Sequence, residues 1–336
     1  MLGLAAGDAL GTTLEFKPQG TFTPIDDIVG GGPFHLEPGQ WTDETSMALC
    51  LAASLVETGG FDPVDQLERY LRWLRQGYMS SAGASFDVGN TVRAALAKYE
   101  TSRNPYSGPT APDTAGNGSL MRLAPVPLFF AGDPKQAIDR AADSSRTTHG
   151  APEALDACRY YAGLILGALA GVDKETLLGA NYAPLPGAWD AEPLSPNVAQ
   201  VAAGSFKGLR AAEIEAGGYV IETLHAALWA FHTTDDFRFG AIRAVNLGDD
   251  ADTTGAVYGQ LAGTYYGVDS IPADWREKIA KRDLILDLAD KLHAHAQPEG
   301  QGPSSVKTDL KQRISERRAH EVNKNRAGPA SGPAPR

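Results

Sequence analysis

The stretch NLGDDADTTGAVYGQLAGTYYG, residues 246–267, places three aspartates directly before a run of small and apolar residues. Glycines recur in this run at every fourth position, and the first residues of the chain repeat the spacing. Glycine inside a helix costs about 1 kcal/mol relative to alanine, so its repetition needs a compensating benefit. Residues four apart share one face of a helix, where glycine lets a second backbone come close. We therefore expect two closely packed helices with the glycine sets Gly3, Gly7 and Gly11, and Gly255, Gly259 and Gly263.

Most other long segments also show the periodicity of helices. The segment 45–60, TSMALCLAASLVETGG, ends on two glycines, and the segment 152–171 has proline in its first turn and glycine after its last. The segments 220–237 and 238–247 follow the same pattern, whereas alternating β-branched runs are nearly absent. The sequence therefore predicts an all-α protein, a compact helical bundle. Its Pro/Gly-rich stretches 17–40, 104–117 and 181–197 are predicted to be long surface loops.

Composition and charge exclude several classes of function. The chain has 336 residues and a net charge of −11. We expect no nucleic-acid partner, because non-specific nucleic-acid binding requires a basic face. Glycines at four-residue spacing also occur in membrane helix dimers, but Asp8 and the short apolar runs argue against a membrane span. Cys50 and Cys158 lie in apolar segments and no secretory signal opens the chain, so we expect buried thiols and a cytoplasmic protein.

The end of the chain differs from the rest. We expect a single domain over residues 1–295 and a basic tail over residues 296–336, which has few large apolar residues. Such a segment cannot bury enough apolar surface to fold alone, so we predict a disordered terminus with one short helix around residues 306–322. An arm for an acidic partner is the alternative interpretation.

The aspartates before the second glycine set need an explanation of their own. Aspartate and threonine are good N-caps, and carboxylates suit the positive end of a helix. Three aspartates within four positions, Asp249, Asp250 and Asp252, exceed what capping needs. With the Thr253 hydroxyl, Asp250 and Asp252 offer hard oxygen ligands suited to Mg²⁺, Mn²⁺ or Ca²⁺. The lack of Cys and His around them disfavours zinc.

A second set of the same kind begins another predicted helix. In GQWTDETSMAL, Thr42, Asp43, Glu44 and Thr45 again combine threonine with consecutive acids. Each set alone is better explained by capping, but two sets beside close-packing glycines favour a metal site. If the two helix starts face one another, five or six oxygen ligands would surround a pair of divalent cations.

Three further segments carry weaker signals. Asp87, followed by Asn90 at a helix start, is on its own best explained as an N-cap. The segment AGNGSLMRLAPV, residues 115–126, has glycines before a helical run, where backbone N–H groups can hold phosphate. No Walker lysine follows it. His149, in SSRTTHG, fits a ligand contact and an ordinary buried histidine equally well.

Two other enzyme classes share part of the acidic motif. The letters DADTT, residues 250–254, fit the Asp-x-Asp-x-Thr of haloacid-dehalogenase-type phosphatases, and DAD resembles glycosyltransferase sites. Both need an α/β sheet, and the phosphatase motif ends a strand near the start of a domain. Gly248 and Asn246 interrupt such a strand here, so we disfavour both classes.

Taken in order, the motifs resemble the ADP-ribosylglycohydrolase family of the dinitrogenase-reductase-activating glycohydrolase type. The resemblance covers residues 3 to about 267, and the ordered set is far more specific than any one motif. It implies an orthogonal helical bundle and a centre of two Mg²⁺ or Mn²⁺ ions. The matching stretches are GLAAGDALGTTLEF, WTDETSMALCLA, FDVGNT, GNGSLMRLAPV, TTHG and NLGDDADTTGAVYGQLAGTYYG.

The resemblance also implies roles for individual residues. It implies metal ligands at Thr42, Asp43, Glu44, Asp250, Asp252 and Thr253. It implies catalytic roles for Glu15, Asp43, Asp87 and Asp250, with Glu15 as a catalytic acid or gate on a mobile loop. It implies substrate contacts at Asn90, Gly116, Asn117, Gly118, Ser119, Met121, His149 and, by a looser match, Tyr219.

The implied activity is metal-dependent cleavage of the bond between ADP-ribose and a protein side chain, with arginine favoured. The partners would be an ADP-ribosylated protein or ADP-ribose itself, and we expect a monomer. One position departs from the family, which usually has Asp where this chain has Glu44. The longer side chain moves the carboxylate by about 1.5 Å. A catalytically impaired ADP-ribose-binding or structural member of the fold is therefore the alternative.

Overall fold

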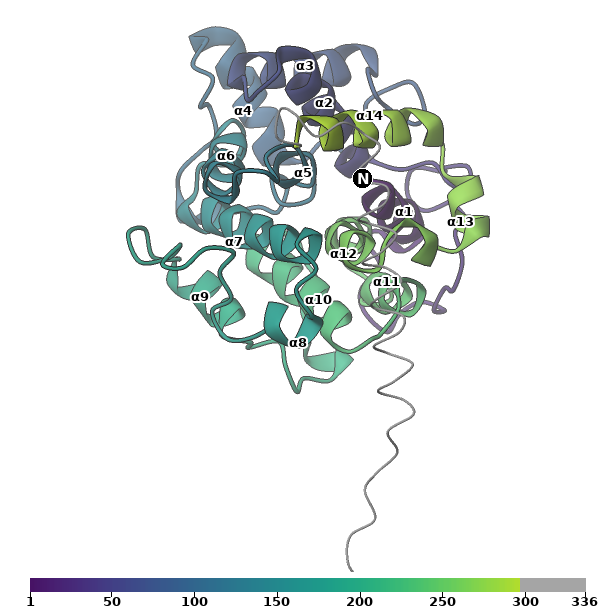
Figure 1. Cartoon of the computed structure of the whole chain (residues 1–336). Helices are drawn as coiled ribbons and strands as arrows, with labels where there is room; N and C mark the ends of the chain where they lie inside the picture. The colour runs from purple at the N-terminus through teal and green to yellow at the C-terminus, as the bar shows by residue number, and fades with distance from the viewer. Residues whose placement is uncertain (297–336) are drawn as a thin grey trace, which may run out of the picture. The chain divides into compact units, whose positions relative to one another are not determined.

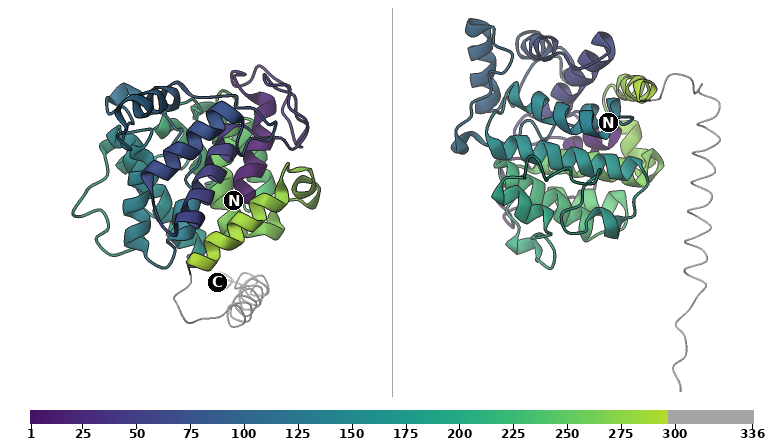
Figure 2. Two further views of the ribbon diagram at one scale, coloured as in Figure 1. Left: turned by 90° about the horizontal axis from the view of Figure 1, so that it is seen from above. Right: turned by 60° about the vertical axis from the view of Figure 1, so that its left-hand side comes forward.

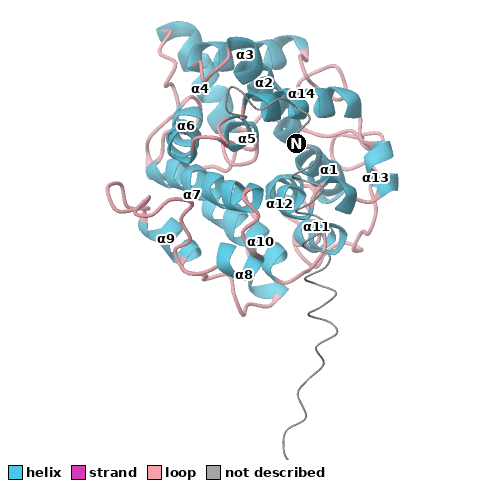
Figure 3. Cartoon of the chain, in the orientation of Figure 1, coloured by secondary structure: helices cyan, strands magenta, loops and turns pink. Residues whose placement is uncertain are grey.

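The structure, a computed structural model, describes residues 1–296, and the regular elements of this part are all helices (Figure 3). The basic tail and its predicted short helix lie outside the described residues. The α-helices are α1 (Leu2–Gly11), α2 (Asp43–Thr58), α3 (Pro63–Gln76), α4 (Asn90–Ser102), α5 (Pro125–Phe129), α6 (Pro134–Arg146), α7 (Pro152–Leu169), α8 (Lys174–Leu177), α9 (Pro196–Ala202), α10 (Val220–His232), α11 (Phe237–Val245), α12 (Ala251–Tyr266), α13 (Ala273–Lys278) and α14 (Arg282–His295). The 3-10 turns are η1 (Thr12–Leu14), η2 (Pro112–Thr114), η3 (Ala211–Glu213) and η4 (Val268–Ser270).

The predicted all-α fold is confirmed, and most helix boundaries follow the sequence signals. Helix α2 ends where Gly59 adopts a left-handed conformation (φ 70°) and donates its N–H to the Leu55 carbonyl. The segment 220–247 is two helices, because the Asp236 side chain accepts from the N–H of Phe239 and begins α11. The phosphatase and glycosyltransferase interpretations are contradicted, since residues 1–296 contain no sheet, only two isolated β-bridges.

Helices α1 and α12 form the centre of the bundle, as the glycine spacing predicted. They lie side by side in Figure 1 and run antiparallel, with Gly3 against Gly259, Gly7 against Gly255 and Gly11 against Ala251. A Cβ atom added to Gly7 would overlap the Gly255 carbonyl oxygen. Helices α7, α10 and α11 surround the remaining sides of α12. The C-terminal end of α1 therefore lies beside the N-terminal end of α12.

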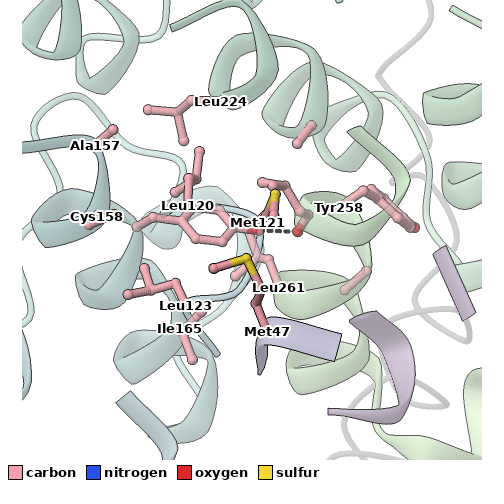
Figure 4. Close-up of a cluster of buried hydrophobic side chains, with 14 of the residues drawn as sticks. Met47, Leu120, Met121, Leu123, Ala157, Cys158, Ile165, Leu224, Tyr258 and Leu261 are labelled. Carbon is pink, nitrogen blue, oxygen red and sulfur yellow. Dashed lines mark hydrogen bonds between the residues drawn. The ribbon is translucent and has the colours of Figure 1, made fainter. Parts of the chain in front are cut away.

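The hydrophobic core extends from this pair toward α2 and α7. Figure 4 shows Met47, Met121, Tyr258 and Leu261 gathered in one buried cluster. Met47 comes from α2, and Tyr258 and Leu261 come from α12. The side chain of Met121 is thus part of the core, and only its backbone remains for a substrate contact. No helix within residues 1–296 is long and apolar enough to cross a membrane.

The predicted loops lie largely between α-helices, namely before α2, between α4 and α5, and between α8 and α9, and Figure 2 shows the bundle from two further sides. Residues 17–40 contain no helix. They fold back onto η1, where the Thr13 hydroxyl donates to the Gly30 carbonyl (2.9 Å). They also meet the start of α12, where the Asp249 N–H donates to the Lys17 carbonyl (2.8 Å). This long loop therefore borders the segment that carries the aspartates.

Candidate active site

Three helix ends bring the two acidic sets together. Because α1 and α12 are antiparallel, the start of α12 meets the start of α2 next to the last turn of α1. The Thr253 hydroxyl donates to Glu44 Oε1 (2.6 Å), and the Thr42 hydroxyl lies 3.3 Å from Asp252 Oδ2. The Thr42 hydroxyl also lies within hydrogen-bond distance of the other oxygen of Glu44. The facing helix starts that the sequence suggested are thus present in the structure.

Helix capping does not account for these side chains. Thr42 and Asp250 occupy the N-cap positions of α2 and α12, yet neither side chain forms a capping hydrogen bond. The Thr42 hydroxyl is bonded to carboxylates, and Asp250 Oδ2 accepts from the Asn117 amide (2.7 Å). The polar atoms therefore face one another across the helix ends and do not close their own helices.

Asp8 is a member of this group that the sequence analysis did not assign. It is fully buried on α1, and its Oδ1 accepts from the N–H and the hydroxyl of Thr42. Its Oδ2 accepts from the N–H and the hydroxyl of Thr45. The signal was available, because a charged residue within the small, apolar opening helix needs buried hydrogen-bond partners.

The donor set fits hard divalent cations. Asp8, Glu44 and Asp252 each offer a carboxylate oxygen within 4.8 Å of the others, and so do Glu15, Asp250 and Asp252. Within residues 1–296 none of these five carboxylates forms an ion pair with lysine or arginine. Buried carboxylates are costly unless they are paired or bind metal. Two oxygen-rich groups that share one aspartate could hold metal ions.

The same crowding changes the proton affinity of the site. Burial raises the pKa of Asp43, Glu44 and Asp252 well above the usual carboxylate range, and neighbouring carboxylates raise it further. Burial, opposed by hydrogen bonds from Thr42 and Thr45, raises the pKa of Asp8 to about 6. A bound dication would reverse these shifts, since it favours the ionised form. Cation binding and proton release are therefore coupled at this site.

Glu15 and Asp87 approach the acidic group from loops. Glu15 follows η1, and its Oε2 accepts the N–H of Ala251 at the first turn of α12 (2.9 Å). Burial and the charge of Asp250 raise the pKa of Glu15 to about 8 and that of Asp87 to about 7. The interpretation of Asp87 as an N-cap is wrong, because Gly89 occupies that position of α4. Asn90 is the first residue of α4 and is exposed.

Three phenylalanines beside these carboxylates were not singled out from the sequence. Phe16 follows Glu15 directly, and Phe86 precedes Asp87. Phe34 lies between them, with its ring centroid 6.2 Å from that of Phe16 and 5.3 Å from that of Phe86. Phe16 is 64% exposed. The two loop carboxylates are therefore bordered by a short row of aromatic rings, which only the tertiary structure assembles.

The glycine-bordered loop after η2 connects to the acidic group through one amide. Asn117 donates to Asp250 Oδ2 and to the Thr223 hydroxyl (2.8 Å). Its backbone N–H donates to the Gly218 carbonyl (3.1 Å), which holds the loop against the segment before α10. The Ser119 hydroxyl instead forms a hydrogen bond with the Ser145 hydroxyl (2.8 Å) inside the protein. Only the backbone at Ser119 is thus available to a ligand.

His149 and Tyr219 lie on either side of this loop. His149 is 2% exposed, and its ring lies against Gly116 and Gly118. Tyr219 pairs with Gly116 through an isolated antiparallel bridge, is half-buried, and donates its hydroxyl to Glu153. His149 and Tyr219 thus contact the loop 116–119, whereas the side chains of Ser119 and Met121 point into the protein.

The all-α bundle and the two facing Thr–acid helix starts agree with what the resemblance to ADP-ribosylglycohydrolases implied. The sequence profile of the ADP-ribosylglycohydrolase family matches residues 1–302, so the chain belongs to this family, whose members are hydrolases. The chain is 40% identical over 299 residues to the ADP-ribosylarginine hydrolase Tri1 of Serratia proteamaculans. This alignment covers 89% of this chain and 79% of the relative.

Two further comparisons agree with this assignment. The chain is 34% identical over 285 residues to the ADP-ribosyl-[dinitrogen reductase] glycohydrolase of Rhodospirillum rubrum, covering 83% of this chain and 88% of the relative. A solved structure described as an ADP-ribosylglycohydrolase-related protein complex superposes with a TM-score of 0.77 at 45% identity. The match covers 88% of this chain and 96% of that one.

Proposed function

We propose that this protein is a metal-dependent ADP-ribosyl hydrolase that releases ADP-ribose from arginine side chains, with a pair of Mg²⁺ or Mn²⁺ ions as cofactor. The observation that carries the proposal is the pair of carboxylate groups that share Asp252 and have no cationic partner within residues 1–296. Relatives at 40% and 42% identity that are named ADP-ribosylarginine hydrolases support the choice of arginine.

The proposed metal ligands are the residues that face one another at the helix starts. They are Thr42, Asp43, Glu44, Asp250, Asp252 and Thr253, and the structure adds Asp8 and Glu15 as carboxylates within reach. Metal ions bound there would orient the ribose hydroxyls and lower the pKa of a bound water. Asp43, first in α2, is buried but has no partner among the described side-chain hydrogen bonds, so its carboxylate is free for this role.

The remaining chemistry requires a proton donor at the departing side chain, because that side chain keeps the electron pair of the broken bond while positive charge builds at the anomeric carbon. The candidates are Asp87, which lies outside both carboxylate groups, and Glu15 when it does not bind metal, since burial raises the pKa of Asp87 to about 7 and that of Glu15 to about 8 in the metal-free protein. A carboxyl group with a pKa in this range can hold a proton at neutral pH and then release it. Glu15 is also anchored to the first turn of α12, which fixes its position.

Substrate binding is proposed for the loop 116–119 and its neighbours. Backbone N–H groups between Gly116 and Met121 would contact the phosphates, and His149, Asn90 and Tyr219 would contact the rest of ADP-ribose. Asn117 would instead act on Asp250, which its amide already holds. A monomeric, cytoplasmic enzyme with no nucleic-acid partner remains our expectation, and both cysteines are free and buried as predicted.

The test is release of ADP-ribose from arginine-linked and serine-linked substrates, with Mg²⁺ and with EDTA. We expect metal-dependent release from the arginine linkage and none from Asp252→Asn. An exposed neighbour in the same motif supplies the control, since Asp249→Asn should retain activity. Release of ADP-ribose in the presence of EDTA would contradict the proposed metal dependence. A preference for the serine-linked substrate would contradict the proposed arginine linkage.

A further inference from the structure

A buried arginine lies behind the proposed phosphate loop without an acidic partner. Arg122 is fully buried, and its guanidinium donates only to neutral groups of residues 1–296. One nitrogen donates to the Gly118 carbonyl (2.9 Å), and the other to the Ser144 carbonyl (3.2 Å) and the Thr148 hydroxyl (2.7 Å). Its other neighbours are the Thr147 hydroxyl (3.5 Å) and the face of the Tyr70 ring, 4.8 Å away. An unpaired buried charge is expensive, so the arrangement needs a reason.

Arg122 determines the direction of the next hydrogen bond. A guanidinium has only donors, so the Thr148 hydroxyl must accept from it. The Thr148 hydroxyl also lies 2.9 Å from His149 Nδ1. Thr148 is fully buried, and its hydroxyl has no other acceptor among the described hydrogen bonds. The hydroxyl proton therefore belongs to the bond with His149, and Nδ1 is the acceptor of that bond.

These contacts determine both the charge and the tautomer of the His149 imidazole. Burial, with the nearby charge of Arg122, lowers the pKa of His149 to about 3, so the ring is neutral at physiological pH. A neutral imidazole that accepts at Nδ1 carries its proton on Nε2. Both backbone ends of His149 are also held, because its N–H and carbonyl bond to the backbone and hydroxyl of Ser145.

The protonated nitrogen lies on the side of the phosphate loop. A Cβ atom at Gly118 would fall 3.1 Å from His149 Nε2, and one at Gly116 would fall 3.5 Å from it. No hydrogen bond to Nε2 occurs among the described residues. The loop that Nε2 faces is the one whose Asn117 side chain holds Asp250. A single N–H donor is thus directed to the place where the glycines leave space beside the acidic group.

We propose that Arg122 and Thr148 are positioning residues that hold His149 as its Nε2–H tautomer, so that the ring presents one fixed donor to the diphosphate of ADP-ribose. The identity of the ligand rests on the proposed function, but the tautomer does not. A donor oriented in advance loses no freedom when the anion binds, which improves affinity. The opposite tautomer would present a lone pair to the anion and repel it.

The tautomer is measured by ¹⁵N–¹H NMR on histidine-labelled protein, with His149→Asn to assign the resonances. We expect Nε2–H at pH 7.5 in the native chain and in Thr148→Ser, which keeps the hydroxyl. Thr148→Val removes the hydroxyl at nearly constant volume and should populate Nδ1–H. Thr147→Val is the matched control, because this adjacent buried threonine has hydrogen bonds with Ser144, Gln66 and Arg122 but none with His149. Retention of Nε2–H by Thr148→Val would overturn the proposal.

Calorimetric titration of ADP-ribose into the same variants tests whether the tautomer contributes to ligand binding. We expect Thr148→Val to bind about tenfold more weakly, the effect of one lost buried hydrogen bond to a charged group. Thr148→Ser and Thr147→Val should bind like the native chain. A changed tautomer with unchanged affinity would refute the role in binding while leaving the tautomer assignment in place. Failure of every chain, native included, to bind ADP-ribose would refute the proposed function and would not alter the NMR result.

Discussion

The Asp8 carboxylate holds Thr42 at two atoms, accepting its backbone N–H (2.9 Å) and its hydroxyl (2.8 Å) on the same oxygen. Its other oxygen holds Thr45 in the same way (3.1 and 2.6 Å). One buried side chain of α1 thus orients the whole first turn of α2. The turn that carries Asp43 and Glu44 is thereby placed relative to α12, since α1 and α12 are in backbone contact.

Asp8→Asn should destabilise the Mg²⁺-loaded protein. The amide retains one accepting oxygen and replaces the other with a donor, so the donors of Thr42 or Thr45 lose their acceptor. We expect a loss of about 1–3 kcal/mol in the free energy of unfolding, measured by urea denaturation with excess Mg²⁺. The exposed Asp139, paired only with Lys135, provides the control, and Asp139→Asn should change stability by less than about 0.5 kcal/mol. Equal losses in the two variants would contradict the role assigned to Asp8.

Metal binding should stabilise the native chain. Mg²⁺ at about 100 times its dissociation constant should add about 2.7 kcal/mol, seen as a higher melting temperature in a thermal scan. Asp252→Asn should abolish the shift, because Asp252 belongs to both carboxylate groups. Asp249→Asn should keep it, since Asp249 is exposed and lies outside both groups. A shift that persists in Asp252→Asn would place the ion elsewhere.

Glu44 can be tested for charge and for length separately. One of its oxygens lies within hydrogen-bond distance of the Thr42 hydroxyl on its own helix start and the other accepts from Thr253 on α12, so the carboxylate spans the two helix starts. We expect Glu44→Gln to lower kcat/KM by at least about 100-fold, since it removes one charged interaction at the proposed metal site. Glu44→Asp should remain within about tenfold of the native chain. Activity in the aspartate variant alone would show that the native chain is an impaired member of the family.

The metal-free protein should lose stability as the pH rises. Burial raises the pKa of Glu15 from 4.5 to about 8, so the folded state binds this proton more tightly than the unfolded chain does. The resulting stabilisation is complete below pH 4.5 and disappears toward pH 8, at roughly 1 kcal/mol per pH unit. Urea denaturation of the native chain and Glu15→Gln across pH 5–8.5 measures it, because the neutral glutamine lacks this dependence. Parallel profiles for the two chains would refute the shift, and excess Mg²⁺ should flatten the native profile.

The close approach of α1 and α12 predicts a strong effect from one methyl group. Gly7→Ala should cost about 3 kcal/mol or more, because its Cβ would overlap backbone atoms of α12 that cannot move independently. Gly60→Ala is the matched control, since nothing lies within 4 Å of a Cβ at that position. Denaturant unfolding of both variants measures the difference. A mild effect at Gly7 would mean that the two helices can separate without loss of the fold.

Much of the fold followed from local patterns in the chain. Helix ends were predicted correctly where a local signal decides them, as at Gly59 and at the proline that begins α7. The four-residue glycine spacing also predicted the α1–α12 pair, because small residues on one face have few other uses in a helix. The bounds of the two acidic sets were equally visible, since both lie at helix starts.

The site depended on contacts that no local pattern contains. Asp8 became part of it because α1 and α12 are antiparallel, which brings the last turn of α1 to the start of α12, and because Asp8 holds the start of α2 there. The rings of Phe16 and Phe34 come from the connection between η1 and α2, and that of Phe86 comes from the connection between α3 and α4. The direction of the Ser119 side chain and the neutral state of His149 likewise follow from burial.

The sequence by itself determined which residues form helices and which residue types are able to bind metal, because propensity, capping and ligand chemistry are local properties. Tertiary structure alone decided which carboxylates lie within 4.8 Å of one another, which protons they keep and which nitrogen of His149 faces the loop. Those properties depend on burial and on distances between residues up to 250 positions apart, and they exist only after the helices have packed.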